Sequence, residues 1–358
     1  MGGGRAPRES VMVLAVRVAM PVVPWRVAVQ AHLGTPGRRV RTEGGAARSS
    51  SRRGLVSSGG TAVAWAACQW LGGGAASVAV AVAEEDVGGV GRMSVGDLAL
   101  MAGEAFESRD YAAAERAFDE LVRREPEAGV WRDGRAQVRI DAKKFRGALE
   151  DADVYVRVAP TEPRAYSTRG LAQEGLSNWE AAVQDYTTAL EYGARLEGGG
   201  RDPYVLNSRG NAYNSMGEFQ LALEDYTDAF LQFQRYKRLS PAVYAQSNAA
   251  LMRVQLNPDN VDENVKLLRD VARRGPGSID VRAALAALLY AAGRVDEAEE
   301  EWEFACRSIN SGSMQSMEYG VQVTVDGCRQ YKDFDWLRRI RRWPPVLVDR
   351  MEAFLRLR

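Results

Sequence analysis

Residues 163–191 (PRAYSTRGLAQEGLSNWEAAVQDYTTALE) and 203–231 (PYVLNSRGNAYNSMGEFQLALEDYTDAFL) contain the same pattern twice. Six positions agree, with spacings of 4, 9, 3, 4 and 3 in both copies. Apolar and small residues at such spacings are typical of a buried helix face, so each copy predicts two short helices, A and B, joined by a turn. The positions are Tyr166, Gly170, Trp179, Ala182, Tyr186 and Ala189 in the first copy, and Leu206, Gly210, Phe219, Ala222, Tyr226 and Ala229 in the second.

Small residues predict how the two helices of a copy pack. Gly170 and Gly210 let helix A approach helix B closely, and the alanine pairs of helix B are expected to face them. The pattern resembles the tetratricopeptide repeat, a family known for binding other proteins. The resemblance implies an all-α solenoid, a right-handed superhelix of about six stacked helix pairs with a helical C-terminal cap, because one pair alone cannot bury its apolar face.

A period of about 34 residues, the length of a tetratricopeptide repeat, extends the array in both directions. Pro126 and Pro160 lie one period apart and end two earlier copies, because proline cannot donate a helix hydrogen bond. Residues 197–202, with three consecutive glycines, form an inserted loop that lengthens the step from the third copy to the fourth. The fifth copy matches the repeat pattern only loosely, and the sixth copy matches it better. The predicted repeats span residues 95–128, 129–162, 163–196, 203–236, 241–274 and 279–312, within a repeat domain of residues 95–310.

The remaining residues, 313–358, are predicted to form a helical cap. Its first helix is expected to carry Trp336, Leu337, Ile340 and Trp343 on one face and to end at Pro344, and a second amphipathic helix follows. The arginines of residues 338–342 (Arg338, Arg339, Arg341 and Arg342) would then form a positive patch, suited to contact with an acidic protein or an anionic membrane surface. Nucleic acid is disfavoured as a partner, because residues 84–358 contain 37 basic and 45 acidic residues.

The N-terminal segment has the composition of a targeting sequence. Residues 1–53 contain ten arginines, no lysine and two acidic residues, as organelle transit peptides do. Residues 54–83 carry no charge; Arg52 and Arg53 in front of them resemble a twin-arginine export signal, and Ala81 and Ala83 resemble a signal-peptidase site. A transit peptide, a cleaved export signal and a linker (residues 84–94) together predict delivery to the chloroplast thylakoid lumen.

Three alternatives stay open for this segment. It could be a low-complexity tail, or residues 54–83 could remain as a membrane anchor, since this uncharged run is long enough to span a bilayer. The third alternative is a destination in the plastid stroma or the mitochondrion.

A second resemblance bears on the compartment. The sequence Arg-Arg-Trp-Pro-Pro at residues 341–345 resembles the C-termini of tetratricopeptide proteins grouped as a chloroplast lumen common family. With the leader, this resemblance implies a scaffold or assembly factor whose clients are subunits of photosystem or other thylakoid complexes.

The residue inventory disfavours catalysis. His32, the only histidine, lies in the leader, so the rest of the chain has no imidazole for a catalytic triad or a zinc site. The three glycines at 198–200 lack the Lys-Ser/Thr of a phosphate loop. We therefore expect no enzyme activity, no metal and no cofactor. Cys306 and Cys328 could form a disulfide or could fill the core as two thiols.

Two arginines precede the repeat glycines. For both Arg169 and Arg209, position i+16 on helix B is an aspartate, Asp185 and Asp225 respectively. We expect each arginine to cross to its aspartate and tie the helix pair together; the alternative is an anion-binding pair of arginines.

The concave surface of such repeats is lined by helix A, which predicts a polar peptide-binding groove. Asn207, Asn211 and Asn214 are spaced i, i+4, i+7 and share one helix face. An amide side chain can pair with the N–H and C=O of a client peptide without reading its sequence. Because Arg164 is the only obvious cation, a clamp for a chaperone C-terminus is disfavoured. The predicted groove comprises Arg164, Ser167, Tyr204, Asn207, Asn211, Asn214 and Gln246, with Glu174 beside them.

The targeting prediction can be tested by sequencing the mature N-terminus of the protein from fractionated organelles. We expect a start near Glu84 in the thylakoid lumen fraction, because cleavage after Ala83 would remove both signals. A start at about residues 40–60 in a soluble stromal or matrix fraction would show that the twin-arginine interpretation is wrong.

Overall fold

The computed structural model describes residues 92–196, 199–275, 278–310, 328 and 331–356. Within this part the chain forms fourteen helices and no strand. The predicted targeting residues, Arg52, Arg53, Ala81 and Ala83, lie outside the described residues. The predictions of a transit peptide, an export signal and a membrane anchor therefore stay predictions. In the described segments, no helix combines the length and the apolar character needed to cross a membrane.

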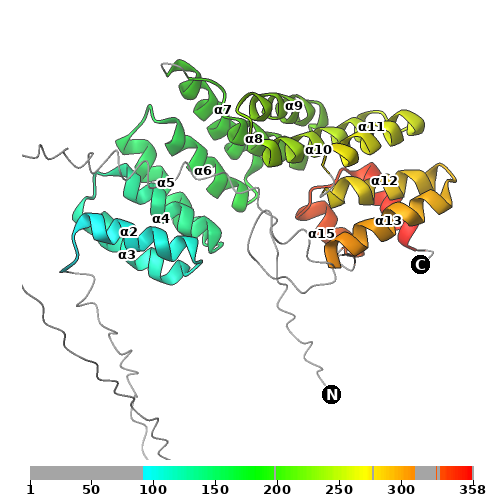
Figure 1. Cartoon of the computed structure of the whole chain (residues 1–358). Helices are drawn as coiled ribbons and strands as arrows, with labels where there is room; N and C mark the ends of the chain where they lie inside the picture. The colour runs from blue at the N-terminus through cyan, green and yellow to red at the C-terminus, as the bar shows by residue number, and fades with distance from the viewer. Residues whose placement is uncertain (1–91, 197–198, 276–277, 311–327, 329–330, 357–358) are drawn as a thin grey trace, which may run out of the picture.

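The helices form six consecutive A/B pairs, which follow one another in chain order across Figure 1. Each helix contacts the next, and A helices of neighbouring pairs also meet at α4–α6, α6–α8 and α10–α12. The fold is thus an all-α solenoid of the tetratricopeptide type, as the sequence predicted. The pairs are α2 (Val95–Glu107) with α3 (Tyr111–Arg124), α4 (Gly129–Asp141) with α5 (Phe145–Val158), α6 (Pro163–Gly175) with α7 (Trp179–Arg195), α8 (Pro203–Met216) with α9 (Phe219–Arg235), α10 (Leu239–Leu256) with α11 (Val261–Arg274), and α12 (Ile279–Ala291) with α13 (Val295–Asn310).

The turns between helices A and B repeat in conformation. Arg109, Lys143 and Ser177 have φ values of 65°, 61° and 63° and occupy the same place in the turns of the first three pairs. Gly217 has a φ of 83° at the corresponding position of the fourth pair, where glycine adopts the left-handed conformation without steric cost. The backbone therefore confirms the repeat period, and the longer step to the fourth pair, independently of the side chains.

Close packing within a pair depends on the repeat glycine. A Cβ atom on Gly170 would lie 2.7 Å from a ring carbon of Tyr186, and one on Gly210 would lie 2.9 Å from the ring of Tyr226. The sequence predicted alanines opposite these glycines, but the tyrosine ring faces each of them directly. Both tyrosine rings are buried, so any larger residue in place of the glycine would force helices A and B apart.

The predicted arginine–aspartate pairs are present. Arg209 holds Asp225 through two hydrogen bonds of 2.8 Å, from Nε and Nη2. Arg169 Nη2 donates to Asp185 over 2.7 Å. A third pair, in α4 and α5, was not predicted: Arg135 Nε donates to Asp151 over 2.8 Å. The three aspartates are buried, so the guanidinium groups supply the charge that burial requires.

Each of these arginines also reaches the preceding pair. Arg135 Nη1 donates to Asp119 of α3 over 2.7 Å, and Arg209 Nη1 donates to Thr187 of α7 over 3.0 Å. Arg169 Nη1 makes the equivalent bond to Asp153 of α5 over 3.4 Å. One side chain thus links its own helix B to the helix B before it, and sets the spacing of neighbouring repeats.

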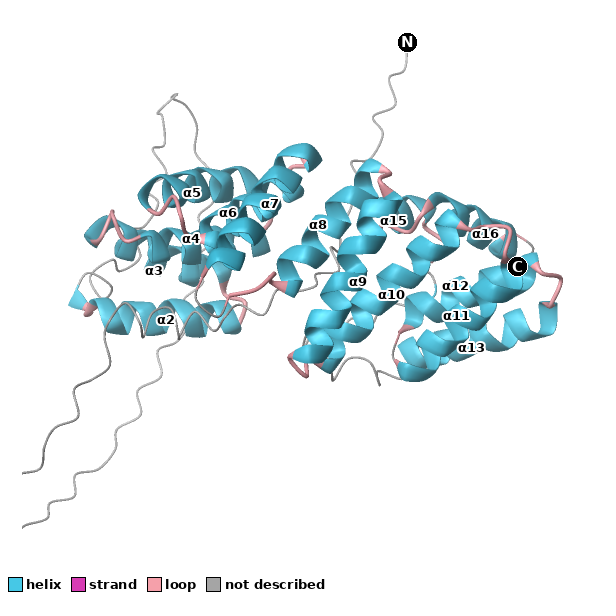
Figure 2. Ribbon diagram, turned by 90° about the horizontal axis from the view of Figure 1, so that it is seen from above, coloured by secondary structure: helices cyan, strands magenta, loops and turns pink. Residues whose placement is uncertain are grey.

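The C-terminal residues follow the predicted cap only in part. Helix α15 (Phe334–Arg339) is short, and α16 (Pro345–Leu355) packs on α12 and α10, as Figure 2 also shows. The prediction that Trp343 shares a helix face with Trp336 is wrong, because α15 ends at Arg339 and Arg342 has a φ of 54°. Pro344 disfavours the helical conformation at Trp343, so the chain crosses from α15 to α16 without helical structure.

A disulfide joins the last repeat to the C-terminal region. Cys306 of α13 is bonded to Cys328, with Cα atoms 5.4 Å apart. The sequence left a disulfide and two core thiols as alternatives, and the structure has the disulfide. Closing a loop of 22 residues stabilises a fold by about 3 kcal/mol through the entropy of the unfolded chain.

We predict that Arg209→Met lowers the free energy of unfolding by about 3 kcal/mol, because the buried Asp225 carboxylate loses both hydrogen bonds from Arg209 and keeps only the more distant Arg201, at 3.8 Å. Adding Asp225→Asn should recover part of this loss. Urea denaturation of the two single variants and the double variant measures the coupling.

Arg123→Met is the matched control. Arg123 also pairs with a carboxylate, Glu120, but its side chain is 70% exposed, so the change in stability should stay below about 1 kcal/mol. Strictly additive losses for Arg209 and Asp225 would contradict the proposed pairing.

Candidate peptide-binding face

The A helices α6, α8 and α10 carry all seven predicted groove residues, and we call the surface formed by these helices the A-helix face. On α6, Arg164 Nε donates to Asp133 of α4 over 2.5 Å, and Thr168 donates to the other oxygen of the same carboxylate over 2.6 Å. Ser167 donates to the main-chain oxygen of Arg164 over 3.0 Å. Arg164 and Ser167 therefore tie α4 to α6 and stabilise α6.

Tyr204 and Asn207, the first two predicted groove residues of α8, pack against other parts of the protein. The Tyr204 ring packs edge-on against Phe233, with ring centroids 4.6 Å apart. Asn207 is 1% exposed, so it is not available to a ligand on the surface. Within the described residues its Oδ1 atom has no hydrogen-bond partner. The structure thus removes Asn207 from the set of surface-facing amides.

Asn211, Asn214 and Gln246 are half-buried on α8 and α10. Asn211 Oδ1 accepts a hydrogen bond of 2.8 Å from the Tyr226 hydroxyl. Asn214 Nδ2 donates to the main-chain oxygen of Arg342 over 2.7 Å, across 128 residues of sequence. Asn214 thus makes the kind of main-chain contact predicted for a peptide ligand, and the segment it holds belongs to the same chain.

That segment, residues 340–344, connects α15 to α16, and we call it the C-terminal strap. Its residue Arg342 lies against the third helix pair: Nη1 forms a 2.7 Å ion pair with Glu174 Oε1, and the guanidinium carbon lies 5.3 Å from the centre of the Trp179 ring. Glu174 and Asn214 occupy equivalent positions of α6 and α8, each at i+4 from the repeat glycine. Arg342 therefore bridges two neighbouring repeats, with its side chain on one and its carbonyl on the other.

The Glu174 carboxylate is oriented by a second donor. The Tyr186 hydroxyl donates to Glu174 Oε2 over 2.7 Å, which leaves Oε1 for the arginine. Burial raises the pKa of the Tyr186 hydroxyl well above its ordinary value, and the nearby Glu174 charge raises it further. Tyr186 therefore stays protonated as a hydrogen-bond donor at physiological pH.

The rest of the strap is anchored on α12. Asp280 accepts hydrogen bonds from the Tyr331 hydroxyl (2.7 Å), Arg341 Nε (3.0 Å) and Trp343 Nε1 (3.3 Å). The Tyr331 ring also packs against Trp343, with centroids 5.8 Å apart. Beyond the strap, Gln255 of α10 accepts from the Val346 amide over 3.0 Å. Amide side chains on two A helices thus hold the main chain of the C-terminal region.

These contacts correct the expectation of a four-arginine surface patch. The Arg338 and Arg339 side chains are 50% and 74% exposed, whereas those of Arg341 and Arg342 are 13% and 22% exposed. Arg341 and Arg342 are ion-paired to Asp280 and Glu174 because the strap turns toward the A helices instead of continuing α15. Only two of the four arginines remain on the surface.

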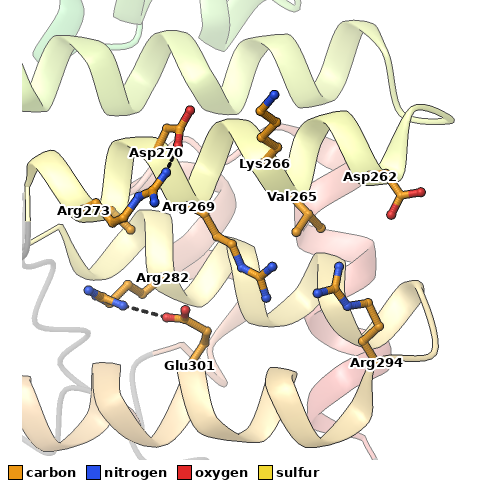
Figure 3. A pocket seen from close by; sticks show the side chains of 10 residues that line it. Asp262, Val265, Lys266, Arg269, Asp270, Arg273, Arg282, Arg294 and Glu301 are labelled. Atoms are coloured by element: carbon orange, nitrogen blue, oxygen red, sulfur yellow. Dashed lines mark hydrogen bonds and ion pairs between the residues drawn. The ribbon is translucent and has the colours of Figure 1, made fainter.

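A second candidate site is a cavity of about 310 Å³ bordered by α11, α12 and α13 (Figure 3). Its lining includes Lys266 and four arginines, but carboxylates neutralise much of that charge. Arg282 pairs with Glu301 over 2.7 Å, and Arg294 pairs with Glu297 over 2.7 Å. The remaining arginines, Arg269 and Arg273, pair with Glu297 and Asp270. In the part of the chain described here, no group of His, Cys, Asp or Glu is placed to hold a metal ion.

Sequence reasoning missed the residues that form the centre of the site. Trp179 was identified only as one of the six positions of the repeat pattern, and Arg342 only as part of a surface patch. One sequence feature could have indicated the site: four residues after the repeat glycine, the third pair has a carboxylate, Glu174, where the fourth pair has an amide, Asn214. A carboxylate at this position can form an ion pair, which an amide cannot.

Comparison with known proteins finds tetratricopeptide proteins among the similar solved structures, whereas no family model matches the sequence. YrrB, a tetratricopeptide protein described as having an unusual peptide-binding site, is 16% identical over 57% of this chain and 95% of its own, with a TM-score of 0.41. The thermophilic tetratricopeptide protein TTC0263 of Thermus thermophilus is 17% identical over 55% and 100% of the two chains, with a TM-score of 0.42. A tetratricopeptide repeat protein from Parabacteroides merdae is 15% identical over 73% and 98%, with a TM-score of 0.47.

We predict that Glu174→Gln and Asn214→Ala each loosen the C-terminal strap, because the first removes the charge that pairs with Arg342 and the second removes the donor to the Arg342 carbonyl. Hydrogen exchange followed by mass spectrometry should show about tenfold faster exchange in a peptide covering residues 340–344. Ser167→Ala is the control, since the Ser167 hydroxyl bonds only within α6. Equal exchange in all three variants would show that these contacts do not hold the strap.

Proposed function

We propose that this protein is a non-catalytic scaffold that binds a segment of a client protein on its A-helix face. The observation that carries the proposal is the hydrogen bond from Asn214 to the main-chain oxygen of Arg342. This contact supports the proposal, because in it an amide on this face holds the main chain of a segment of the same protein that has no helical structure. A second amide, Gln255, accepts from a main-chain N–H in the first turn of α16, that of Val346.

The chemistry of these contacts suits a protein ligand. Carboxamide groups offer both a donor and an acceptor, so they can satisfy the C=O and N–H groups of any non-helical peptide. Specificity then comes from side-chain contacts such as the one between Arg342 and Glu174. Gln246 extends the polar positions of the face to α10, and with Asn211 and Asn214 it gives a client contacts on two A helices.

We extend the proposal to a compartment and a class of client. The arginine-rich segment, the uncharged run after Arg52 and Arg53, and Ala81 and Ala83 support delivery to the thylakoid lumen. Together with the C-terminal resemblance, they favour thylakoid or photosystem complex subunits as clients and a role in assembly. A stromal or mitochondrial adaptor with the same peptide-binding face is the alternative, as is a membrane-anchored scaffold.

The location of the client can be tested by site-specific photocrosslinking in extracts of the native organelle. A photoreactive amino acid at Gln246 should crosslink to a client, because this residue lies on the A-helix face. The same amino acid at Gln184, an exposed residue of the B helix α7, should not. Mass spectrometry then identifies the client segment, and a synthetic peptide of that segment should bind the purified protein and block the crosslink.

Crosslinking at Gln184 but not at Gln246 would contradict the proposal, since it would place the client on the B helices. A crosslinked segment whose synthetic peptide does not bind the purified protein would also contradict it.

A further inference from the structure

The surroundings of Arg342 form a pocket for a guanidinium group. Glu174 provides a carboxylate oxygen at 2.7 Å, and the ring of Trp179 lies 5.3 Å from the guanidinium carbon. The Glu174 side chain is 13% exposed, so its charge is poorly screened by water. A half-buried carboxylate beside an aromatic ring favours a planar, delocalised cation, and arginine matches it better than lysine does.

The pocket does not depend on the strap for its shape. Glu174 and Trp179 belong to α6 and α7, and the Tyr186 hydroxyl of α7 orients the carboxylate. These groups come from one helix pair, far in the sequence from Arg342. The third helix pair therefore keeps a site for arginine when Arg342 leaves.

Arg342 itself is an imperfect occupant. Its backbone is left-handed, with a φ of 54°, a conformation that is unfavourable for residues other than glycine. Its Nε atom is buried and has no hydrogen-bond partner within the described residues. A client arginine that approaches with a relaxed backbone avoids the first of these costs and can avoid the second.

The remaining anchors of the strap allow Arg342 to leave alone. Arg341 and Trp343 are bonded to Asp280 of α12, and Trp343 is 3% exposed. These contacts lie on the sixth helix pair, whereas the arginine pocket lies on the third. Displacing Arg342 thus breaks the contacts to Glu174 and Asn214 and leaves the attachment of α16 in place.

We propose that the client segment carries an arginine that enters the pocket of Glu174 and Trp179 in place of Arg342, so that the strap competes with the client. This inference rests on the proposed function and adds the chemistry of the client: a non-helical segment with an arginine. Because the strap is part of the same chain, its effective concentration is on the order of millimolar. It therefore rejects segments that bind the amides but offer no arginine.

The test is selection of a phage-displayed library of random nonapeptides on three forms of the full chain: wild type, Arg342→Ala, and Arg342→Ala with Glu174→Gln. Arg342→Ala should retain more phage, with arginine enriched at one peptide position, because the pocket is empty. Adding Glu174→Gln should remove the enrichment and weaken binding of the selected peptides by about tenfold, as expected for the loss of a charged hydrogen bond.

Arg339→Ala is the matched control, because Arg339 is an exposed arginine paired with Asp335 outside the strap. It should select like wild type. Circular dichroism confirms that each variant is folded. If Arg342→Ala fails to fold, the comparison of wild type with Glu174→Gln alone replaces it, and arginine enrichment should be present in the first and lost in the second.

The outcomes separate the two proposals. Peptides that bind the A-helix face without arginine enrichment in any variant would overturn this inference and leave the scaffold function intact. Arginine enrichment that persists with Glu174→Gln would also overturn it. No selected peptide with any variant would count against peptide binding itself, and hence against both proposals.

Discussion

The buried arginine–aspartate pair is the interaction on which the first four repeats depend. Asp151, Asp185 and Asp225 are 2%, 5% and 3% exposed, so each carboxylate needs a cation inside the fold. The arginine that supplies it also bonds to helix B of the preceding pair. The same group therefore fixes the distance between helices A and B and the distance between consecutive repeats. The relative position of α6 and α8, and hence of Glu174 and Asn214, follows from this spacing.

Most of the fold could be predicted because its determinants are local and periodic. Gly170 with Tyr186, and Gly210 with Tyr226, recur at fixed spacing, and two of the three arginine–aspartate pairs were found from that spacing. The pair of Arg135 and Asp151 has the same sequence separation, but Ala136 replaces the repeat glycine there and weakens the pattern. The disulfide between Cys306 and Cys328 was left open, because it depends on where the C-terminal region packs and no periodicity encodes that.

The candidate site was less predictable, because residue spacing shows which side chains share a helix face but not what that face contacts. Asn207, Asn211 and Asn214 were assigned to one face from their spacing, yet Asn207 is buried, Asn211 bonds to Tyr226, and Asn214 holds the strap. The role of each residue depends on the group that it contacts. For Asn214 this group is the main chain of Arg342, 128 residues away in the sequence. The local sequence does not distinguish an arginine on an exposed helix from an arginine in a pocket. Only the end of α15 at Arg339 separates Arg338 and Arg339 from Arg341 and Arg342.

The segment that connects the two helices of the C-terminal cap also lies on the A-helix face. The last repeat exposes an apolar surface that α16 covers by packing on α12 and α10, and the chain reaches this position only by crossing from α15 through the strap. Asp280 on the sixth helix pair holds the strap at Arg341 and Trp343. Between them, Arg342 is held by Glu174 and Asn214 on the third and fourth pairs. The cap thus places Arg342 beside Glu174 and Asn214, while Arg341 and Trp343 keep the cap attached when Arg342 leaves its pocket. A ligand that takes the place of Arg342 gains its own contacts only at the cost of those that the strap makes, so its net affinity is the difference between two similar sets of interactions.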